Sequence, residues 1–169
     1  MQPLKAKPTA DEKKQHKELL IDLWMLGDTY GVAKMQNEAM HALTELFASG
    51  LVLTVEDVNY IYNRAHGVDS ALRQLAVLRS VAQLESPANK KHSIIDYEKL
   101  AAQPGFLAKM YEAVKMWMAF DTGPKKNKWT LFAAQAQVQR MLRVPEPTMP
   151  VQEAAAVKTF TPGEVIELD

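Results

Sequence analysis

The sequence predicts an all-α protein: an irregular bundle of about five to seven helices that begins with a helical hairpin and ends in a disordered tail. Three observations lead to this fold class. Apolar residues recur at intervals of three and four along most of the chain, which is the period of an amphipathic helix. Glycine, proline and helix-capping residues separate these stretches. No segment alternates apolar and polar residues for more than a few positions, as a half-buried strand would.

The hairpin is expected after a flexible N-terminal arm, residues 1–10. Thr9 or Asp11 is placed to cap a first helix that runs to about Tyr30. Gly31 then stands where a left-handed residue ends a helix without steric cost. A second helix, at about 32–48, stops before a Ser-Gly pair. The short break between the two helices makes them neighbours in the fold.

The middle of the chain predicts two further helices. Thr54 can accept a hydrogen bond from the amide three residues on, so it is expected to cap the stretch "VEDVNYIYNRAH". Gly67 ends that stretch, and residues 70–84 follow with apolar side chains around most of the circumference. A helix of this kind packs against neighbours on more than one side.

The last third predicts a short helix at 95–102, a helix at 106–120 and a final helix at 129–143. Loops at 85–93 and 121–128 separate them. The buried face of the 106–120 helix is expected to consist of Leu107, Met110, Val114 and Trp117. The helical domain thus spans residues 11–143, and prolines with an Ala-rich stretch predict a disordered tail at 144–169.

Composition excludes several classes of function. The 20 Lys and Arg residues balance the 20 Asp and Glu residues, so bulk charge attracts neither nucleic acid nor an anionic membrane. There is no cysteine for a disulfide, a thiolate metal site or a thiol nucleophile. The first 18 residues lack the apolar centre of a secretory signal, and no apolar run approaches the ~20 residues of a membrane span. We expect an intracellular protein of the cytoplasm or nucleus, neither secreted nor in a membrane.

No pattern of catalytic, cofactor or metal-binding residues is present. The four histidines are far apart, and only His41 with Glu45 shows the i,i+4 spacing of half a helical metal site. Gly-rich phosphate loops and a Gly-x-Ser-x-Gly elbow are absent. Paired carboxylates stand at helix starts, where the helix dipole explains them. The sequence predicts a protein that is not an enzyme and needs no cofactor.

A small basic cluster, Lys125, Lys126 and Lys128, precedes Trp129. One interpretation is a solvated surface turn. The other is a nuclear-localisation or nucleic-acid patch, which would make the chain a nuclear, nucleic-acid-associated regulatory factor. The zero net charge argues against nucleic acid as the partner.

Three motifs follow one another over residues 19–120. The first, "LLIDLWMLGDTYGVAKMQNEAMHAL", combines aliphatic residues, an aromatic residue, Leu-Gly-Asp and Met-Gln-Asn. The second is Tyr-Ile-Tyr followed by Ser-x-Leu-Arg-x-Leu, and the third is Pro-x-Phe-Leu. Together they resemble the BACK-like helical extension that follows the BTB/POZ core of fungal BTB-domain proteins. The matching positions are Leu20, Ile21, Leu23, Trp24, Leu26, Gly27, Asp28, Tyr30, Val32, Met35, Gln36, Asn37, Ala39, Met40, Leu43, Tyr60, Ile61, Tyr62, Ser70, Leu72, Arg73, Leu75, Pro104, Phe106 and Leu107.

The chain departs from this family at two points. Leu78 occupies a position where the family often has Asp, and the 18 residues before Leu19 leave no room for the BTB core itself. The resemblance implies a protein–protein interaction module, in some relatives a substrate adaptor for a cullin ubiquitin ligase. Dimerisation and most cullin contact belong to the BTB core in such proteins, so neither is carried over to this chain.

Without a BTB core, we expect part of the first helix to be exposed. The hypothesis is that Leu20, Leu23 and Trp24, with Tyr30, form a surface for a protein partner of unknown identity, for self-association or for packing on a BTB core. Burying each Leu-sized side chain would contribute ~1.5–3 kcal/mol. The alternative is that the N-terminal arm folds back and covers this face.

Overall fold

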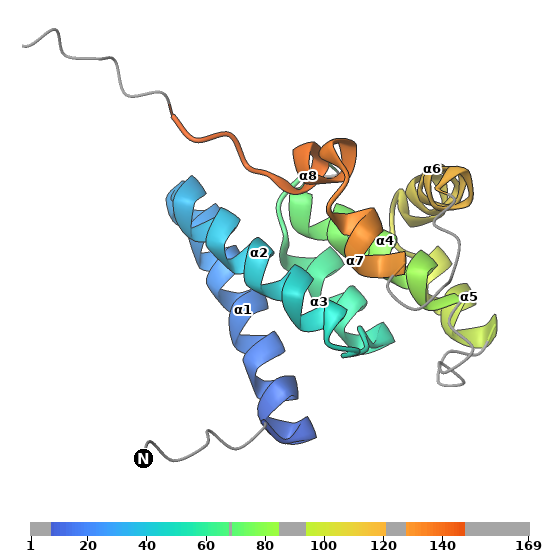
Figure 1. The fold of residues 1–169 in the computed structure, drawn as a ribbon, viewed down its shortest axis with the longest axis horizontal. Coiled ribbons are helices and arrows are strands. Elements are labelled where there is room, and N and C mark those ends of the chain that lie inside the picture. The colour runs from blue at the N-terminus through green and yellow to red at the C-terminus, as the bar shows by residue number, and fades with distance from the viewer. Residues whose placement is uncertain (1–7, 68, 85–93, 121–127, 148–169) are drawn as a thin grey trace, which may run out of the picture.

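The protein is all-α, as its sequence predicts. The computed structural model describes residues 8–67, 69–84, 94–120 and 128–147. Within these residues there are eight helices and no strand (Figure 1). They are α1 (Ala10–Tyr30), α2 (Ala33–Ala48), α3 (Val55–Arg64), α4 (Ala71–Leu84), α5 (Ile94–Ala101), α6 (Phe106–Ala119), α7 (Lys128–Ala133) and α8 (Ala136–Leu142).

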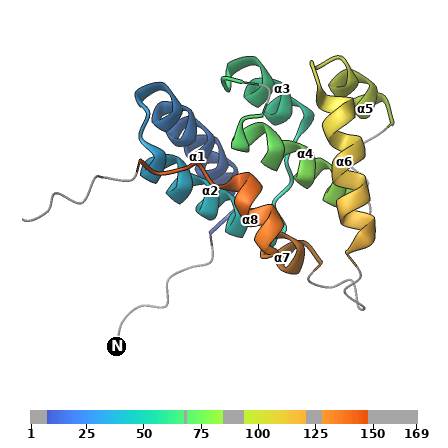
Figure 2. The same cartoon turned by 90° about the horizontal axis from the view of Figure 1, so that it is seen from above.

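The helices form a row of three pairs. Figure 2 shows the α1–α2 hairpin at one end, α3 with α4 in the middle and α5 with α6 at the other end. The last two helices, α7 and α8, pack across one side of this row, where α7 contacts α2 and α8 contacts α4. The position of α4 between α3, α6 and α8 explains why its sequence is apolar nearly all round.

Local side-chain chemistry fixes the ends of α1 and α3. The Thr9 hydroxyl accepts from the Glu12 amide at 3.2 Å, and the Glu12 carboxylate accepts from the Thr9 amide at 2.7 Å. Thr54 and Asp57 form the same reciprocal capping box at the start of α3. Gly31 ends α1 in the left-handed region, at φ 66°. The predicted caps Thr9, Thr54 and Gly31 are confirmed.

The hairpin closes tightly because α1 presents a glycine to α2. A Cβ atom at Gly27 would lie 2.8 Å from the Cγ atom of Gln36 and 3.2 Å from its backbone nitrogen. The Val32 amide donates to the Gly27 carbonyl at 2.8 Å, just beyond the end of α1. The backbones of α1 and α2 therefore approach at a point that only glycine fits without displacement.

The core of the protein is organised around α4. Its Arg79 is buried, donates to the Leu51 carbonyl at 2.8 Å, and lies over the rings of Phe47 and Trp129, 5.4 and 5.0 Å from their centroids. Burial lowers the pKa of Arg79 to about 10, which leaves the guanidinium charged at neutral pH. The Arg79 side chain thus joins α4 to α2, to α7 and to the loop that precedes α3.

Two helices differ from the sequence-based expectation. In α6, Trp117 is buried and Met110 and Val114 pack against the core as predicted, but Leu107 is 57% exposed. Phe106 is buried instead and packs edge-on against Tyr62 at 5.6 Å. The predicted final helix is two helices, because Gln135 has an extended backbone with φ −61° and ψ 138°. The break lets α7 pack on α2 while α8 packs on α4, and it raises the number of helices above the predicted five to seven.

The start of the predicted tail is fastened to the helical domain. Residues 144–147 belong to the described part of the chain, and Val144 packs against the core. The prediction of a disordered segment beginning at residue 144 is therefore wrong for these four residues, because the sequence gives no sign of a contact with α2. The remainder of the predicted tail, 148–169, lies outside the described residues.

Candidate functional site

The predicted interaction face on α1 is largely core. Trp24 is 1% exposed and Leu20 is 7% exposed, and both belong to the same buried cluster as Leu43 and Phe47 of α2. Leu23 is half-buried. The expectation that Leu20 and Trp24 are exposed for docking is therefore wrong: this chain's own helices cover them. Of the four predicted residues, only Tyr30 is strongly exposed, at 74%.

A different apolar surface remains on α1. Leu19 is 64% exposed and Leu26 is 48% exposed, and these residues form one stripe with Leu23 and Tyr30. The intervals of four, three and four residues are those of the contact positions in a coiled coil. We call these four residues the outer stripe. It includes two residues of the predicted face, Leu23 and Tyr30, and α1 carries it at the end of the row of helices (Figure 2).

Polar side chains beside the outer stripe are paired within the chain. The Tyr60 hydroxyl donates to the Asp22 carboxylate at 2.6 Å, and this hydrogen bond raises the pKa of Tyr60. Lys17, which is buried, forms an ion pair with Asp57 of α3. These two contacts attach α3 to α1 and leave the outer stripe as the apolar surface of the helix.

The predicted basic cluster is only partly described. Lys125 and Lys126 lie outside the described residues. Lys128 is the first residue of α7, and its Nζ atom lies 4.4 Å from the ring centroid of Trp117. The one described member of this cluster therefore packs its charge over an aromatic ring of the protein.

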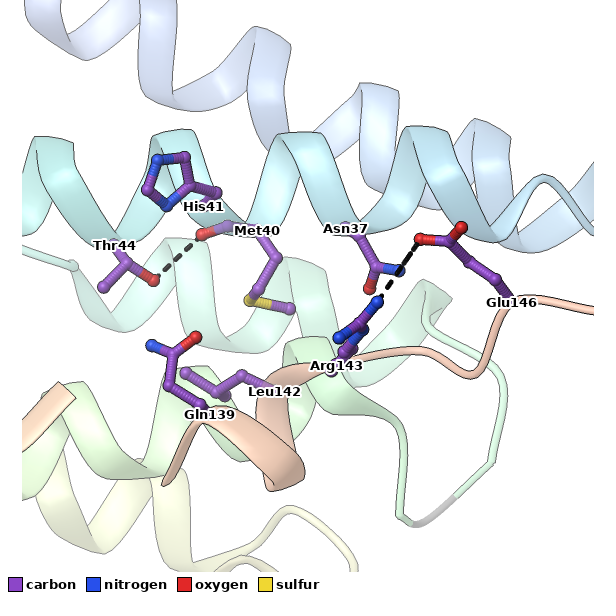
Figure 3. A pocket seen from close by; sticks show the side chains of 8 residues that line it. All are labelled: Asn37, Met40, His41, Thr44, Gln139, Leu142, Arg143 and Glu146. Carbon is purple, nitrogen blue, oxygen red and sulfur yellow. Dashed lines mark hydrogen bonds and ion pairs between the residues drawn. The ribbon is translucent and has the colours of Figure 1, made fainter. Parts of the chain in front are cut away.

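A second candidate site surrounds residues 143–147, which leave α8 in an extended conformation. We call this segment the strap. The Asn37 side-chain amide donates to the Val144 carbonyl at 2.9 Å and accepts from the Val144 amide at 2.7 Å. A cleft of about 270 Å³ adjoins this contact between α2 and α8 (Figure 3). Its walls are formed by Asn37, Met40, His41, Thr44, Gln139, Leu142, Arg143 and Glu146.

A larger cleft, of about 420 Å³, also adjoins the strap. Its polar wall includes Asp28, which accepts from the Gln36 amide at 3.3 Å and lies 3.1 Å from Nδ1 of His66. Trp24 contributes to the same cleft, and its buried indole N–H has no hydrogen-bond acceptor. Such an unsatisfied donor is unusual in a protein interior. The cleft is lined by Trp24, Asp28, Gln36, His66, Asp69, Ser70, Ala71, Gln74, Arg140, Met141, Arg143, Val144 and Pro145.

Within the described part of the chain, His, Asp and Glu side chains form no group of three that could hold a metal ion. The same residues contain no helix long and apolar enough to cross a membrane.

Comparison with known proteins returned no relative. No protein-family model matches the chain, and no similar protein was found among the curated proteins or the solved structures. The resemblance to the BTB extension stays a prediction that rests on its motifs, and the function has to be argued from the surface of this chain.

Sequence reasoning missed the outer stripe and the strap for different reasons. Leu19 and Leu26 have helical spacing, but the sequence places apolar residues on two faces of α1 and does not say which face the bundle covers. Asn37 and Val144 are 107 positions apart. An Asn on a helix followed much later by a Val-Pro pair gives no local signal of a contact.

Proposed function

We propose that this chain is a non-enzymatic protein–protein interaction module and that the outer stripe is its docking face. The observation that carries the proposal is the coiled-coil spacing of exposed apolar residues, with Leu19 64%, Leu26 48% and Tyr30 74% exposed. Isolated exposed Leu residues are common on proteins, whereas a regular stripe of them is typical of a helix that receives another helix.

The occupant that fits the outer stripe is an amphipathic helix of a partner protein. Its own contact positions would fill the spaces between Leu19, Leu23 and Leu26, as knobs fill holes in a coiled coil. Each Leu-sized side chain buried in this way contributes ~1.5–3 kcal/mol before the cost of association is subtracted. Three or four such contacts are enough for a reversible complex.

The resemblance to BTB proteins narrows the proposal. In that family the hairpin packs behind the BTB core, and the motif that carries the resemblance contains Leu23, Leu26 and Tyr30 of the outer stripe. A helix of a BTB-type core is therefore the partner that we propose. The role of a ubiquitin-ligase adaptor would follow only if such a core were bound.

The test uses charge substitution on matched surfaces. Leu26→Glu places a carboxylate in the outer stripe, and Leu107→Glu places one at a similarly exposed leucine of α6. Both variants and the wild type would be affinity-purified from source cells, with partners quantified by mass spectrometry. We expect Leu26→Glu to lose the specific partners about tenfold or more, as one misplaced charge does at an apolar contact, and Leu107→Glu to retain them.

Two results would separate the alternatives. If sedimentation shows a wild-type dimer that only Leu26→Glu dissociates, the partner helix is α1 of a second copy and the stripe is still the docking face. If partners and oligomeric state are the same for the wild type and both variants, the outer stripe is an inert surface and the proposal is wrong.

A further inference from the structure

The strap is held as a bound peptide would be held. Asn37 makes two hydrogen bonds to the backbone of one residue, Val144, and its side-chain amide also donates to the Glu146 carboxylate at 3.2 Å. A side-chain amide that pairs with a backbone N–H and C=O recognises extended main chain and leaves the side chain free to vary. Residues before proline are confined to extended conformations, so Val144 ahead of Pro145 presents this backbone with little loss of entropy.

The strap lies in the middle of a longer trough. Arg143 lines both the cleft of about 270 Å³ and the cleft of about 420 Å³. Figure 3 shows the smaller cleft from close by, with Asn37 on α2 opposite Arg143 and Glu146 of the strap. Residues 143–147 thus separate two open volumes and fill only part of the trough between α2, α4 and α8.

The larger cleft gives such a peptide room beside the strap. It is lined by Val144 and Pro145 of the strap and by Trp24 of α1.

We infer that the trough is a binding site for an extended, proline-containing peptide segment of a partner, and that the strap is the chain's own competitor for it. The required ligand has a backbone amide and carbonyl for Asn37 and a β-branched residue followed by proline. This site lies beside α8 and is separate from the outer stripe, so it does not depend on the proposed function.

The strap is suited to being displaced. Its ion pair, between Arg143 and Glu146, spans 3.9 Å and joins two largely exposed side chains. Val144 is half-buried, and Pro145, Glu146 and Pro147 are exposed. Segments with few buried contacts open far more readily than the core does. A tethered competitor acts at an effective concentration on the order of millimolar. A partner segment must therefore bind tightly enough to displace a competitor present at that concentration.

The experiment is an NMR titration of the full-length chain with a blocked synthetic peptide of the sequence LRVPEPT, which corresponds to residues 142–148. Val144→Asp weakens the competitor, because it places a charge where a half-buried valine packs. We expect this variant to bind the peptide about tenfold or more tightly than the wild type does, since intramolecular competition is reduced. Binding should move the side-chain amide signals of Asn37.

The matched control changes the ligand and leaves the protein intact. A peptide methylated on the valine amide cannot donate to Asn37, so its affinity should fall about tenfold, the value of one good hydrogen bond. Cooperative melting would show that Val144→Asp is folded. The inference is overturned if this folded variant shows no saturable chemical-shift change at millimolar peptide concentrations. It is also overturned if the methylated peptide binds equally well or the Asn37 amide signals do not move. If Val144→Asp does not fold, the wild type is titrated with the unmodified and the methylated peptide. The same difference in affinity and the same shift of the Asn37 signals are then required.

Discussion

Helices α1 and α4 belong to one bundle but have opposite environments. In α4, 11 of 14 residues are buried, because α3, α6 and α8 pack against it. In α1, only five of 21 residues are buried, and a second apolar face is left exposed. Apolar content alone does not distinguish these two cases. What distinguishes them is how many neighbours the fold brings to the helix, and this makes α4 the structural centre and leaves α1 with an exposed apolar face.

The two helices also differ in how they bury a cation. Lys17 of α1 is neutralised by the Asp57 carboxylate of α3, whereas Arg79 of α4 lies between aromatic rings and donates to a backbone carbonyl. A lysine is a compact charge that needs a counter-ion when buried, and a guanidinium can be stacked. The attachment of α1 to α3 thus includes a buried charge pair beside the Tyr60–Asp22 hydrogen bond.

The largest expected effect tests that attachment. Lys17→Met would leave Asp57 as a largely buried carboxylate without its cation, at a cost of about 3–5 kcal/mol in the free energy of unfolding. Urea unfolding followed by circular dichroism measures it. The double variant Lys17→Met/Asp57→Asn should recover most of the loss, because the amide oxygen can still accept from the Thr54 amide. If Lys17→Met cost less than about 1 kcal/mol, the level of a surface ion pair, the pair would not be what fastens α1.

The second-largest expected effect compares the burial of α4 and of α1 directly. Leu75→Ala in α4 removes a fully buried side chain and should lower the free energy of unfolding by about 2–5 kcal/mol. Leu26→Ala in α1 makes the same chemical change on the outer stripe and should stay within about 0.5 kcal/mol. Thermal melts of both variants check the prediction. A comparable loss in both would mean that the outer stripe is covered in solution, by a second copy or by another part of the chain.

The smallest expected effect is the pH dependence of stability that arises from Tyr62 of α3. Burial raises the pKa of Tyr62 to about 12, from about 10 in an unfolded chain. Because the native state holds the phenol proton more tightly, its contribution to stability is intact below pH 10 and is lost as pH rises toward 12. By pH 11 the wild type should lose about 1.4 kcal/mol at this residue, one pKa unit's worth.

Tyr62→Phe should not show this loss. The quantity to compare is the difference in the free energy of unfolding between Tyr62→Phe and the wild type. Urea denaturation measures it at pH 7 and again at pH 11. An unchanged difference would contradict the burial of the Tyr62 hydroxyl as the cause of its raised pKa.

The predictable parts of the fold are those that local chemistry fixes. Thr9 and Thr54 with their partners three residues on, and Gly31 after α1, mark helix ends through bonds between near neighbours, so the sequence alone locates them. The all-round apolar pattern of α4 likewise predicts that it is surrounded. These features need no knowledge of where distant segments lie.

The unpredicted parts depend on contacts between distant segments. Leu107 and Phe106 are equally plausible core residues until Tyr62 of α3 is known to pack on one of them. The break at Gln135 follows from α7 and α8 having different partners. For the candidate sites the sequence is less informative. The expectation that Leu20 and Trp24 are exposed assigns their contacts to a BTB core, whereas helices of this chain cover them.

The contact between Asn37 and Val144 also has a consequence for synthesis on the ribosome. The α1–α2 hairpin emerges before the other described helices and can pair at once, since its two helices are neighbours in sequence. Val144 follows Asn37 by 107 residues, and closing so long a loop has an entropic cost that only a largely folded chain can offset. Asn37 therefore stays without its extended partner while nearly all of the bundle is made. The other wall of the trough, α8, ends at Leu142, so the trough and the strap are completed together, after the rest of the described bundle.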